Sequence, residues 1–211
     1  MAVVTISRQF GVRGWMLGEA LASRLDYQFI SRSVINEMAR EAQVSVEWIE
    51  AVEKEAGGRL MRMASKLVSS SFIDRHLGES RHDFDESKYT VFLKELILRL
   101  ASKDNVILLG RGAQFIIPDK PNNIKIFLAA NMEDRKEFIA ETWEVDLSDA
   151  EQMILNREKK WRHFLKSLDP RDPEDPCVYS LTLNLSHIDL EYAEEIIVGL
   201  IERGENRKGE G

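Results

Sequence analysis

The chain begins with an almost continuous apolar run that leads through a glycine-containing loop into a helical pattern. The run, AVVTIS at residues 2–7, is followed by Gly11 and Gly14 and then by the helical segment ALASRL. A strand that is apolar on both faces must be covered on both faces, as happens in a parallel sheet between layers of helices. This opening unit therefore favours an α/β fold over an α+β fold.

Four further short runs have the composition of strands, and longer segments of helical period separate them. The runs at 105–110 and 124–130 are apolar almost throughout, which is typical of strands buried on both faces. The runs at 27–30 and 178–185 complete the set. The sequence thus predicts one parallel sheet of five strands covered by helices.

Signals at helix ends place three of these helices. Asn131 is expected to cap a helix whose first turn is acidic. Ser148 and Glu151 form a capping box ahead of a helix at 149–166. The last helix, roughly 189–203, is expected to end at the glycine that follows it.

About seventy residues, 32–104, separate the second and third strand candidates and contain no convincing strand. A single crossover helix needs far fewer residues, so we expect a helical insert. Its predicted helices lie at 32–42, 46–56, 58–76 and 87–102. The sequence has no internal repeat, which indicates a single domain, 1–211, with its core at 1–31 and 105–204, the insert at 32–104 and a frayed tail at 205–211.

The composition excludes several classes of protein. The 211 residues are 44% hydrophobic and 31% charged, enough to bury one sizeable core. A single cysteine, Cys177, excludes an internal disulfide framework and a multi-cysteine metal site, and the four histidines are not spaced like metal ligands. A net charge of −7 argues against a protein that coats nucleic acid, and no apolar run is long enough to cross a membrane. We expect a cytoplasmic protein, without a secretory signal, whose partner is a small molecule.

The loop after the first strand, SRQFGVRG, has the composition of an anion-binding loop. Glycines let backbone N–H groups approach an anion, and the following helix offers the positive end of its dipole. A complete Walker motif would add a lysine and a hydroxyl. Read back from ALASRL, the lysine position falls on Gly14 and the hydroxyl position on Met16. From these residues alone, a phosphate loop and a structural turn are equally open.

Two other segments carry arginines suited to anions. Arg111 stands between Gly110 and Gly112 at the end of a predicted strand, where ligands of parallel sheets bind. Its guanidinium suits phosphate, although it can equally pair with a carboxylate at a helix start. The basic segment 157–171 runs into a loop rich in proline and aspartate. It is either a solvated helix face or a mobile lid that closes cations over phosphates.

Taken together, four motifs in order resemble the cytidylate kinase-like proteins, within the nucleoside monophosphate kinases. They are TISRQFGVRG, LLGRGAQFI, KIFLAANMEDR and YSLTLNLSHIDLEYAEEII, and they cover nearly the whole chain. The resemblance implies a three-layer P-loop kinase fold with a five-stranded parallel sheet, a helical insert that binds the nucleoside monophosphate, and a lid at about 157–177. It also implies ATP and Mg²⁺ as cofactors.

The same resemblance implies roles for particular residues. Gly11, Val12, Arg13 and Gly14 would lie at the donor phosphates, and Arg111 would meet the phosphate of the acceptor. The catalytic candidates are Arg13, Arg111, Arg157 and Arg162, and the candidates for cofactor binding are Arg8, Gly11, Val12, Arg13, Gly14, Trp15 and Met16. No residue is predicted to bind a metal ion directly. Phosphoryl transfer depends on the positioning of the substrates and on cations, so the predicted activity depends mainly on these arginines.

The loop departs from the family pattern in several places. Val12 and Arg13 replace a serine and a glycine, and Trp15 and Met16 replace polar residues. Arg13 has two interpretations: it replaces the missing lysine as a cation, or it fills the anion site and pairs with a carboxylate. In the lid, Trp161 stands near a position where arginine is expected, although a shift of one residue would let Arg162 serve.

Two functions follow from the resemblance and its departures. The first is a kinase that moves a phosphoryl group from ATP to a nucleoside monophosphate, with CMP or dCMP favoured. The second is a catalytically silent relative that binds nucleotides or a partner in a regulatory role. Self-association into a homodimer through the insert is a further possibility.

Overall fold

The computed structural model describes residues 2–31 and 86–206 of the chain. Within these ranges the five expected strands form one sheet, with the order β2-β3-β1-β4-β5 and every neighbouring pair parallel. The predicted parallel sheet is therefore confirmed. The strands are β1 (Val3–Arg8), β2 (Gln28–Ile30), β3 (Val106–Leu109), β4 (Asn123–Ala129) and β5 (Leu181–Asn184).

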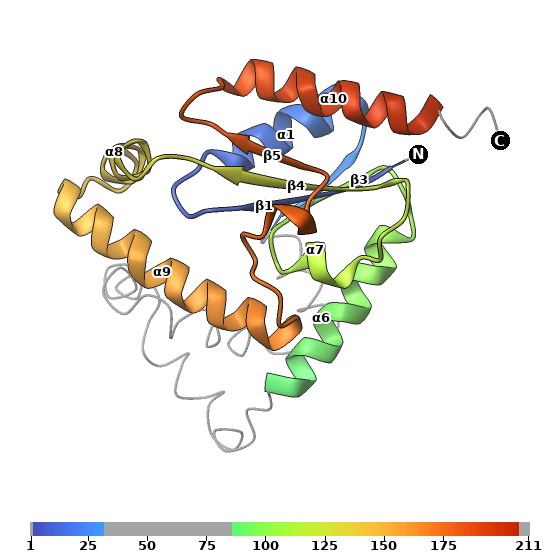
Figure 1. Ribbon diagram of the computed structural model, residues 1–211, viewed down its shortest axis with the longest axis horizontal. Helices are drawn as coiled ribbons and strands as arrows, with labels where there is room; N and C mark the ends of the chain where they lie inside the picture. Colours follow the sequence, from blue (N-terminus) through green and yellow to red (C-terminus); the bar gives the residue numbers. More distant parts are fainter. Residues whose placement is uncertain (1, 32–85, 207–211) are drawn as a thin grey trace, which may run out of the picture.

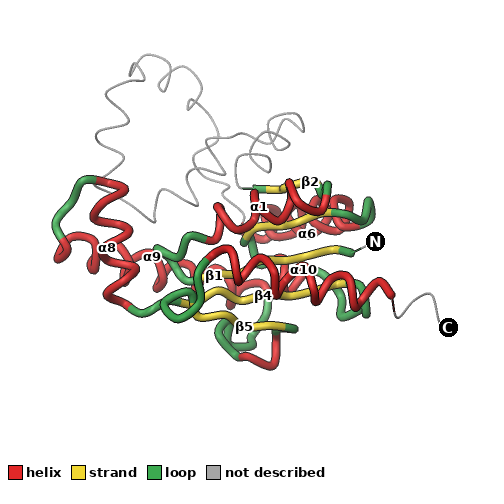
Figure 2. The backbone as a smooth tube through the Cα atoms, turned by 90° about the horizontal axis from the view of Figure 1, so that it is seen from above, coloured by secondary structure: helices red, strands yellow, loops and turns green. Residues whose placement is uncertain are grey.

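Helices cover both faces of the sheet (Figure 1). Helices α1 (Gly14–Leu25) and α10 (Leu190–Asn206) lie on one face, and α6 (Glu86–Ala101), α7 (Ala113–Ile116) and α9 (Leu147–Leu168) lie on the other. Helix α8 (Met132–Trp143) lies beyond the carboxyl ends of the strands, as Figure 2 shows from a second direction. No helix in the described part of the chain is sufficiently long and apolar to span a membrane.

The central strand β1 separates two apolar cores. Val4 and Ile6 pack into the core that α1 and α10 complete, whereas Val3 packs into the core completed by α6. This alternation follows from the period of two residues in a strand. A third, smaller cluster joins α8 to α9 around Ile139 and Ile154. Because β1 is apolar toward both layers, it can occupy the middle of the sheet.

Several element ends differ from the sequence predictions. Helix α9 begins after Asp146, so Ser148 is inside the helix and the predicted capping box is wrong. Asn131 does precede α8, but its side chain makes no capping hydrogen bond. Helix α10 continues through Gly204 because this glycine does not adopt the left-handed conformation that ends a helix. Strand β5 begins three residues later than predicted because a 3₁₀ turn forms first, at Pro176–Val178.

Part of the predicted insert lies outside the described residues. This holds for the expected helices at 32–42, 46–56 and 58–76, and for the homodimer contact through them. The helix predicted at 87–102 is described, as α6, and its buried leucines and isoleucine confirm the helical spacing expected there. Of the predicted frayed tail, 207–211 is outside the described residues.

Two helical glycines give a test of the packing between α1 and the sheet. A Cβ at Gly18 would lie 2.9 Å from Cζ of Phe29 and closer still to Cε2, whereas a Cβ at Gly199 would meet no atom within 4 Å. We expect Gly18→Ala to lower the free energy of unfolding by about 1–3 kcal/mol through overpacking. Gly199→Ala should raise it by about 0.5–1 kcal/mol, because alanine is the better helix former. Urea unfolding of both variants measures the difference, and equal effects would contradict the packing described.

Candidate phosphate-binding site

The loop between β1 and α1 is held against α8. Gly11 has a φ of 88°, and a Cβ on it would lie 3.1 Å from both Cβ and the carbonyl oxygen of Arg135. Glycine is therefore required here for its conformation and for the close approach of α8. Val12, the next residue, is buried in the core beneath α1. The loop thus presents a fixed backbone at the carboxyl edge of the sheet.

The first residue of α1, Gly14, leaves room for the side chain of Arg8. A Cβ on Gly14 would lie 2.6 Å from Cδ of Arg8 and 3.2 Å from Cδ1 of Leu128. Arg8 is the last residue of β1, so its side chain starts on the central strand and crosses the beginning of α1. The positive end of a helix and a guanidinium therefore lie together.

The turn after β3 brings a second arginine to the same edge of the sheet. Gly110, Arg111 and Gly112 all have positive φ, at 76°, 59° and 70°. Arg111 is only 9% exposed, and the amide of Gly110 donates to the carbonyl of Ile6 at 2.9 Å, which ties the turn to β1. A left-handed conformation at a residue other than glycine costs on the order of 1 kcal/mol and is concentrated at functional sites.

The two arginines repel one another. Burial and the nearby charge of Arg111 lower the pKa of Arg8 to about 10. No carboxylate among residues 2–31 and 86–206 forms an ion pair with Arg8. The partly buried guanidinium of Arg8 at a helix N-terminus favours the entry of an anion, because both the side chain and the helix end present positive charge there.

The other predicted residues of the loop lie elsewhere. Arg13 is exposed, and its guanidinium lies 5.3 Å from the ring centroid of Phe138 on α8. It forms no ion pair with a described carboxylate, so the side chain that crosses Gly14 is that of Arg8. Trp15 and Met16, on the first turn of α1, are 47% and 40% exposed.

Arg157 of α9 packs against aromatic rings. Its guanidinium lies 4.5 Å from the ring centroid of Phe10 and 5.8 Å from that of Trp143, and these two rings stack 5.6 Å apart. Burial lowers the pKa of Arg157. This predicted catalytic arginine therefore holds the loop through Phe10.

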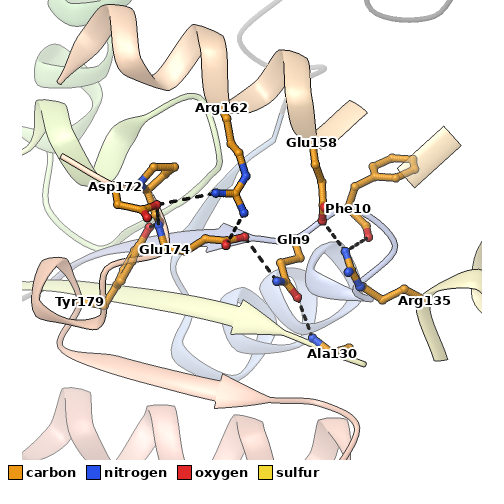
Figure 3. Close-up of polar contacts among 10 residues, drawn as sticks. Gln9, Phe10, Ala130, Arg135, Glu158, Arg162, Asp172, Glu174 and Tyr179 are labelled. Carbon is orange, nitrogen blue, oxygen red and sulfur yellow. Dashed lines mark hydrogen bonds and ion pairs between the residues drawn. The ribbon is translucent and has the colours of Figure 1, made fainter. Parts of the chain in front are cut away.

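Arg135 fixes the backbone of the same loop. Its Nη1 atom donates to the carbonyl oxygen of Phe10 at 3.2 Å and pairs with Glu158 of α9 (Figure 3). Arg135 is buried, so one side chain joins the loop, α8 and α9. The sequence signal for this residue is the EDR at the start of α8, which was not assigned to the site.

Arg162 belongs to a second polar network at the same edge. It pairs with Glu174, which also accepts a hydrogen bond of 3.4 Å from Nε2 of Gln9 (Figure 3). Oε1 of Gln9 in turn accepts from the amide of Ala130, at the end of β4, at 3.1 Å. Oδ1 of Asp172 lies 3.9 Å from Nη1 of Arg162. Gln9 and Glu174 had no role in the sequence prediction, because only the fold brings them together.

A pocket opens between β1, α9 and the segment before β5. Burial raises the pKa of Tyr179, one of its lining residues, to about 12, and its hydroxyl donates to the carbonyl of Pro173. Both Trp161 and Arg162 face the pocket. The lining side chains are those of Ser7, Arg8, Gln9, Gln114, Phe127, Glu158, Trp161, Arg162, Leu165, Pro173, Glu174 and Tyr179.

Comparison with protein families identifies the chain. Residues 3–187 match the model of the Cytidylate kinase-like family, so the chain belongs to this family. No protein in a search of curated proteins matches it. The resemblance seen in the four sequence motifs is therefore confirmed at the level of the family.

Solved structures show the same fold at low sequence identity. An uncharacterized protein from Eubacterium ventriosum has a TM-score of 0.64 at 17% identity, with 96% of this chain and 98% of that chain covered. A gluconokinase from Sinorhizobium meliloti has a TM-score of 0.53 at 14% identity, with 100% of this chain and 97% of that chain covered. A shikimate kinase from Bacteroides thetaiotaomicron has a TM-score of 0.53 at 12% identity, with 95% of this chain and 98% of that chain covered. The chain has the P-loop kinase fold, with its sheet order 2-3-1-4-5.

The network around Arg135 gives a prediction about stability. Arg135 and Glu158 are 6% and 17% exposed, so Arg135→Met leaves a carboxylate with little access to water. We expect the free energy of unfolding to fall by about 3 kcal/mol or more. The matched control is Arg24→Met, which breaks an ion pair of a 47% exposed arginine with Glu194 and should cost at most about 1 kcal/mol.

Urea unfolding of both variants tests this difference. The double variant Arg135→Met/Glu158→Leu should recover much of the loss, since it removes the unpaired carboxylate. Equal losses in the two single variants would show that Arg135 does not organise the loop.

Proposed function

We propose that this member of the cytidylate kinase-like family transfers a phosphoryl group from ATP to a nucleoside monophosphate, with CMP or dCMP as the favoured acceptor. One observation carries the proposal. Arg8, at the end of β1, lies against the N-terminus of α1 and beside the turn that carries Arg111, at the carboxyl edge of a parallel sheet. Ligands of open parallel sheets bind at this edge, and phosphates bind at helix N-termini.

In the proposed reaction, the residues act by position and charge. The donor phosphates would lie along 11–14 and Arg8, and Arg111 would hold the phosphate of the acceptor. An oxygen of that phosphate attacks the γ-phosphorus of ATP, the bond to the β–γ bridging oxygen breaks, and ADP leaves. The arginines offset the charge that spreads over the moving phosphoryl group, which is the main demand of this chemistry.

Segment 157–177 is the proposed lid. Arg162 faces the pocket but is bound to Glu174, so it would have to exchange this carboxylate for a phosphate when substrates enter. Arg157 supports the loop through Phe10 and is better placed to position it than to touch a phosphate. Closing of such a segment excludes water and completes the set of cations.

The described residues form no dedicated protein site for a magnesium ion, so such an ion would be held largely by the phosphates of the nucleotide and by water. Residues 2–31 and 86–206 contain no group of three or more Asp, Glu, His or Cys side chains that could hold a metal ion. Glu158 and Glu174, which line the pocket, are each bound by an arginine, and Trp15 and Met16 carry no oxygen in their side chains. The protein's own part of the proposed charge stabilisation comes from the arginines.

A second candidate is a nucleotide-binding protein without turnover. The observations that favour it are the exposed Trp15 and Met16 where the family has polar residues, and the pairing of Arg162 with Glu174. Both candidates bind small-molecule nucleotides, so binding and transfer must be measured separately.

The decisive experiment is a transfer assay with ATP, Mg²⁺ and a panel of nucleoside monophosphates, run beside a binding titration. We expect turnover with CMP or dCMP, and a fall in kcat/KM of about 100-fold or more in Arg111→Ala, as for the loss of one essential charge-stabilising group. The control, Arg24→Ala, removes an exposed arginine on α1 that pairs with Glu194 and should leave turnover unchanged.

The outcomes separate the two candidates. Tight nucleotide binding by the wild-type chain without transfer would support the silent relative. No binding of any nucleotide would contradict both candidates.

A further inference from the structure

We infer that Arg8 supplies, from the end of β1, the phosphate-binding cation that a P-loop usually takes from a lysine at the start of its helix, and that position 14 is glycine because Arg8 crosses it. On this inference the loop has kept a phosphate-binding cation, but on the strand instead of the helix. Arg8 and Gly14 depend on each other, because the glycine makes room for the arginine. The inference deepens the proposed function, because it rests on the donor phosphates lying at this loop.

The path of the Arg8 side chain carries the inference. A Cβ on Gly14 would lie 2.6 Å from Cδ and 3.5 Å from Nε of Arg8, and a Cβ on Gly110 would lie 3.5 Å from Nη1. The guanidinium therefore spans from the first residue of α1 to the turn after β3. In a Walker motif, a lysine at the position of Gly14 would reach toward the β and γ phosphates.

No described side chain neutralises the charge of Arg8. Arg8 is half-buried near the charge of Arg111, and within the described residues its guanidinium has neither a carboxylate partner nor a hydrogen bond. Burial, and then the charge of Arg111, lower the pKa of Arg8. A phosphate between Arg8 and the amides of the α1 N-terminus would supply a counter-ion for this guanidinium.

The position of Arg8 is set by a rigid element. β1 is the central strand, and Arg8 stands in register with Leu128 of β4, whose side chain also borders Gly14. A cation on the sheet is held more firmly than one on a loop, which suits the positioning that phosphoryl transfer requires.

The same geometry makes Arg8 and a side chain at position 14 mutually exclusive. Any residue larger than glycine would force Cδ of Arg8 out of its place, since real side-chain carbons do not approach to 2.6 Å. Restoring the lysine of a standard P-loop should therefore harm this protein unless Arg8 is removed at the same time. If the loop had lost its lysine and no other residue had taken over its role, Gly14→Lys would instead improve phosphate binding.

The test is a double-mutant cycle with four full-length proteins: the wild type, Arg8→Ala, Gly14→Lys and the double variant. Calorimetric titrations with ATP and with inorganic pyrophosphate, in buffer containing EDTA, measure phosphate binding without a metal ion. We expect each single variant to bind about 10- to 100-fold more weakly, the range for loss of a charged hydrogen bond. The double variant should bind more tightly than either single variant, because the new lysine then enters the space that Arg8 has left.

Two further variants keep the test independent of folding. Arg8→Met retains the aliphatic stem against Gly14 and removes only the charge, so it should weaken binding as Arg8→Ala does while its urea unfolding matches the wild type. Arg24→Ala, an exposed arginine on α1, should leave the affinity unchanged.

Three results would overturn the inference. Wild-type affinity in Arg8→Met and Arg8→Ala would show that Arg8 is not the cation, and the proposed function would survive if the wild type still bound ATP. Tighter binding of ATP or pyrophosphate by Gly14→Lys alone would show that the loop lost its lysine without a replacement. No binding of ATP or pyrophosphate by the wild type would remove the inference together with the proposed function.

Discussion

The burial of β1 on both faces is the constraint on which the rest of the structure depends. Its side chains alternate between the core under α1 and α10 and the core under α6, so the strand must be covered by helices on both faces, and it occupies the middle of the sheet. That place puts its carboxyl end between the ends of β3 and β4. The loop that follows and Arg8 are consequently delivered to the edge where a parallel sheet binds ligands.

The loop is then fixed from the side of α8 and α9. Gly11 fits closely against Arg135, whose guanidinium holds the carbonyl of Phe10 and the carboxylate of Glu158. The ring of Phe10 contacts both the ring of Trp143 and the guanidinium of Arg157. These contacts join the loop to the segment proposed as the lid, so a movement of α9 and the shape of the loop are physically linked.

Much of the fold was predictable because it follows from short-range patterns. The apolar runs located all five strands, and helical spacing located α6, α8, α9 and α10. The errors concern element ends, where capping chemistry is weak: Asp146 precedes α9 in place of the predicted Ser148, and Gly204 stays helical. Of the residues predicted for the site, Arg8, Gly11, Gly14 and Arg111 lie at one edge of the sheet, and their roles stay predictions. Gln9, Arg135 and Glu174, which the structure brings to the same edge, were not among the predicted site residues.

The sequence by itself determined the class of fold, the family and the glycines at which the backbone comes close to other groups. These depend on hydrophobic period and on local conformation, which are written in neighbouring residues. Only the tertiary structure decided which arginine crosses Gly14. Arg8 and Arg13 are both in the loop motif, but the direction of each side chain depends on what packs beside it: Leu128 and the turn at Gly110 in one case, and the ring of Phe138 in the other. Such contacts join residues that are far apart in the chain, so no pattern within a single segment records them.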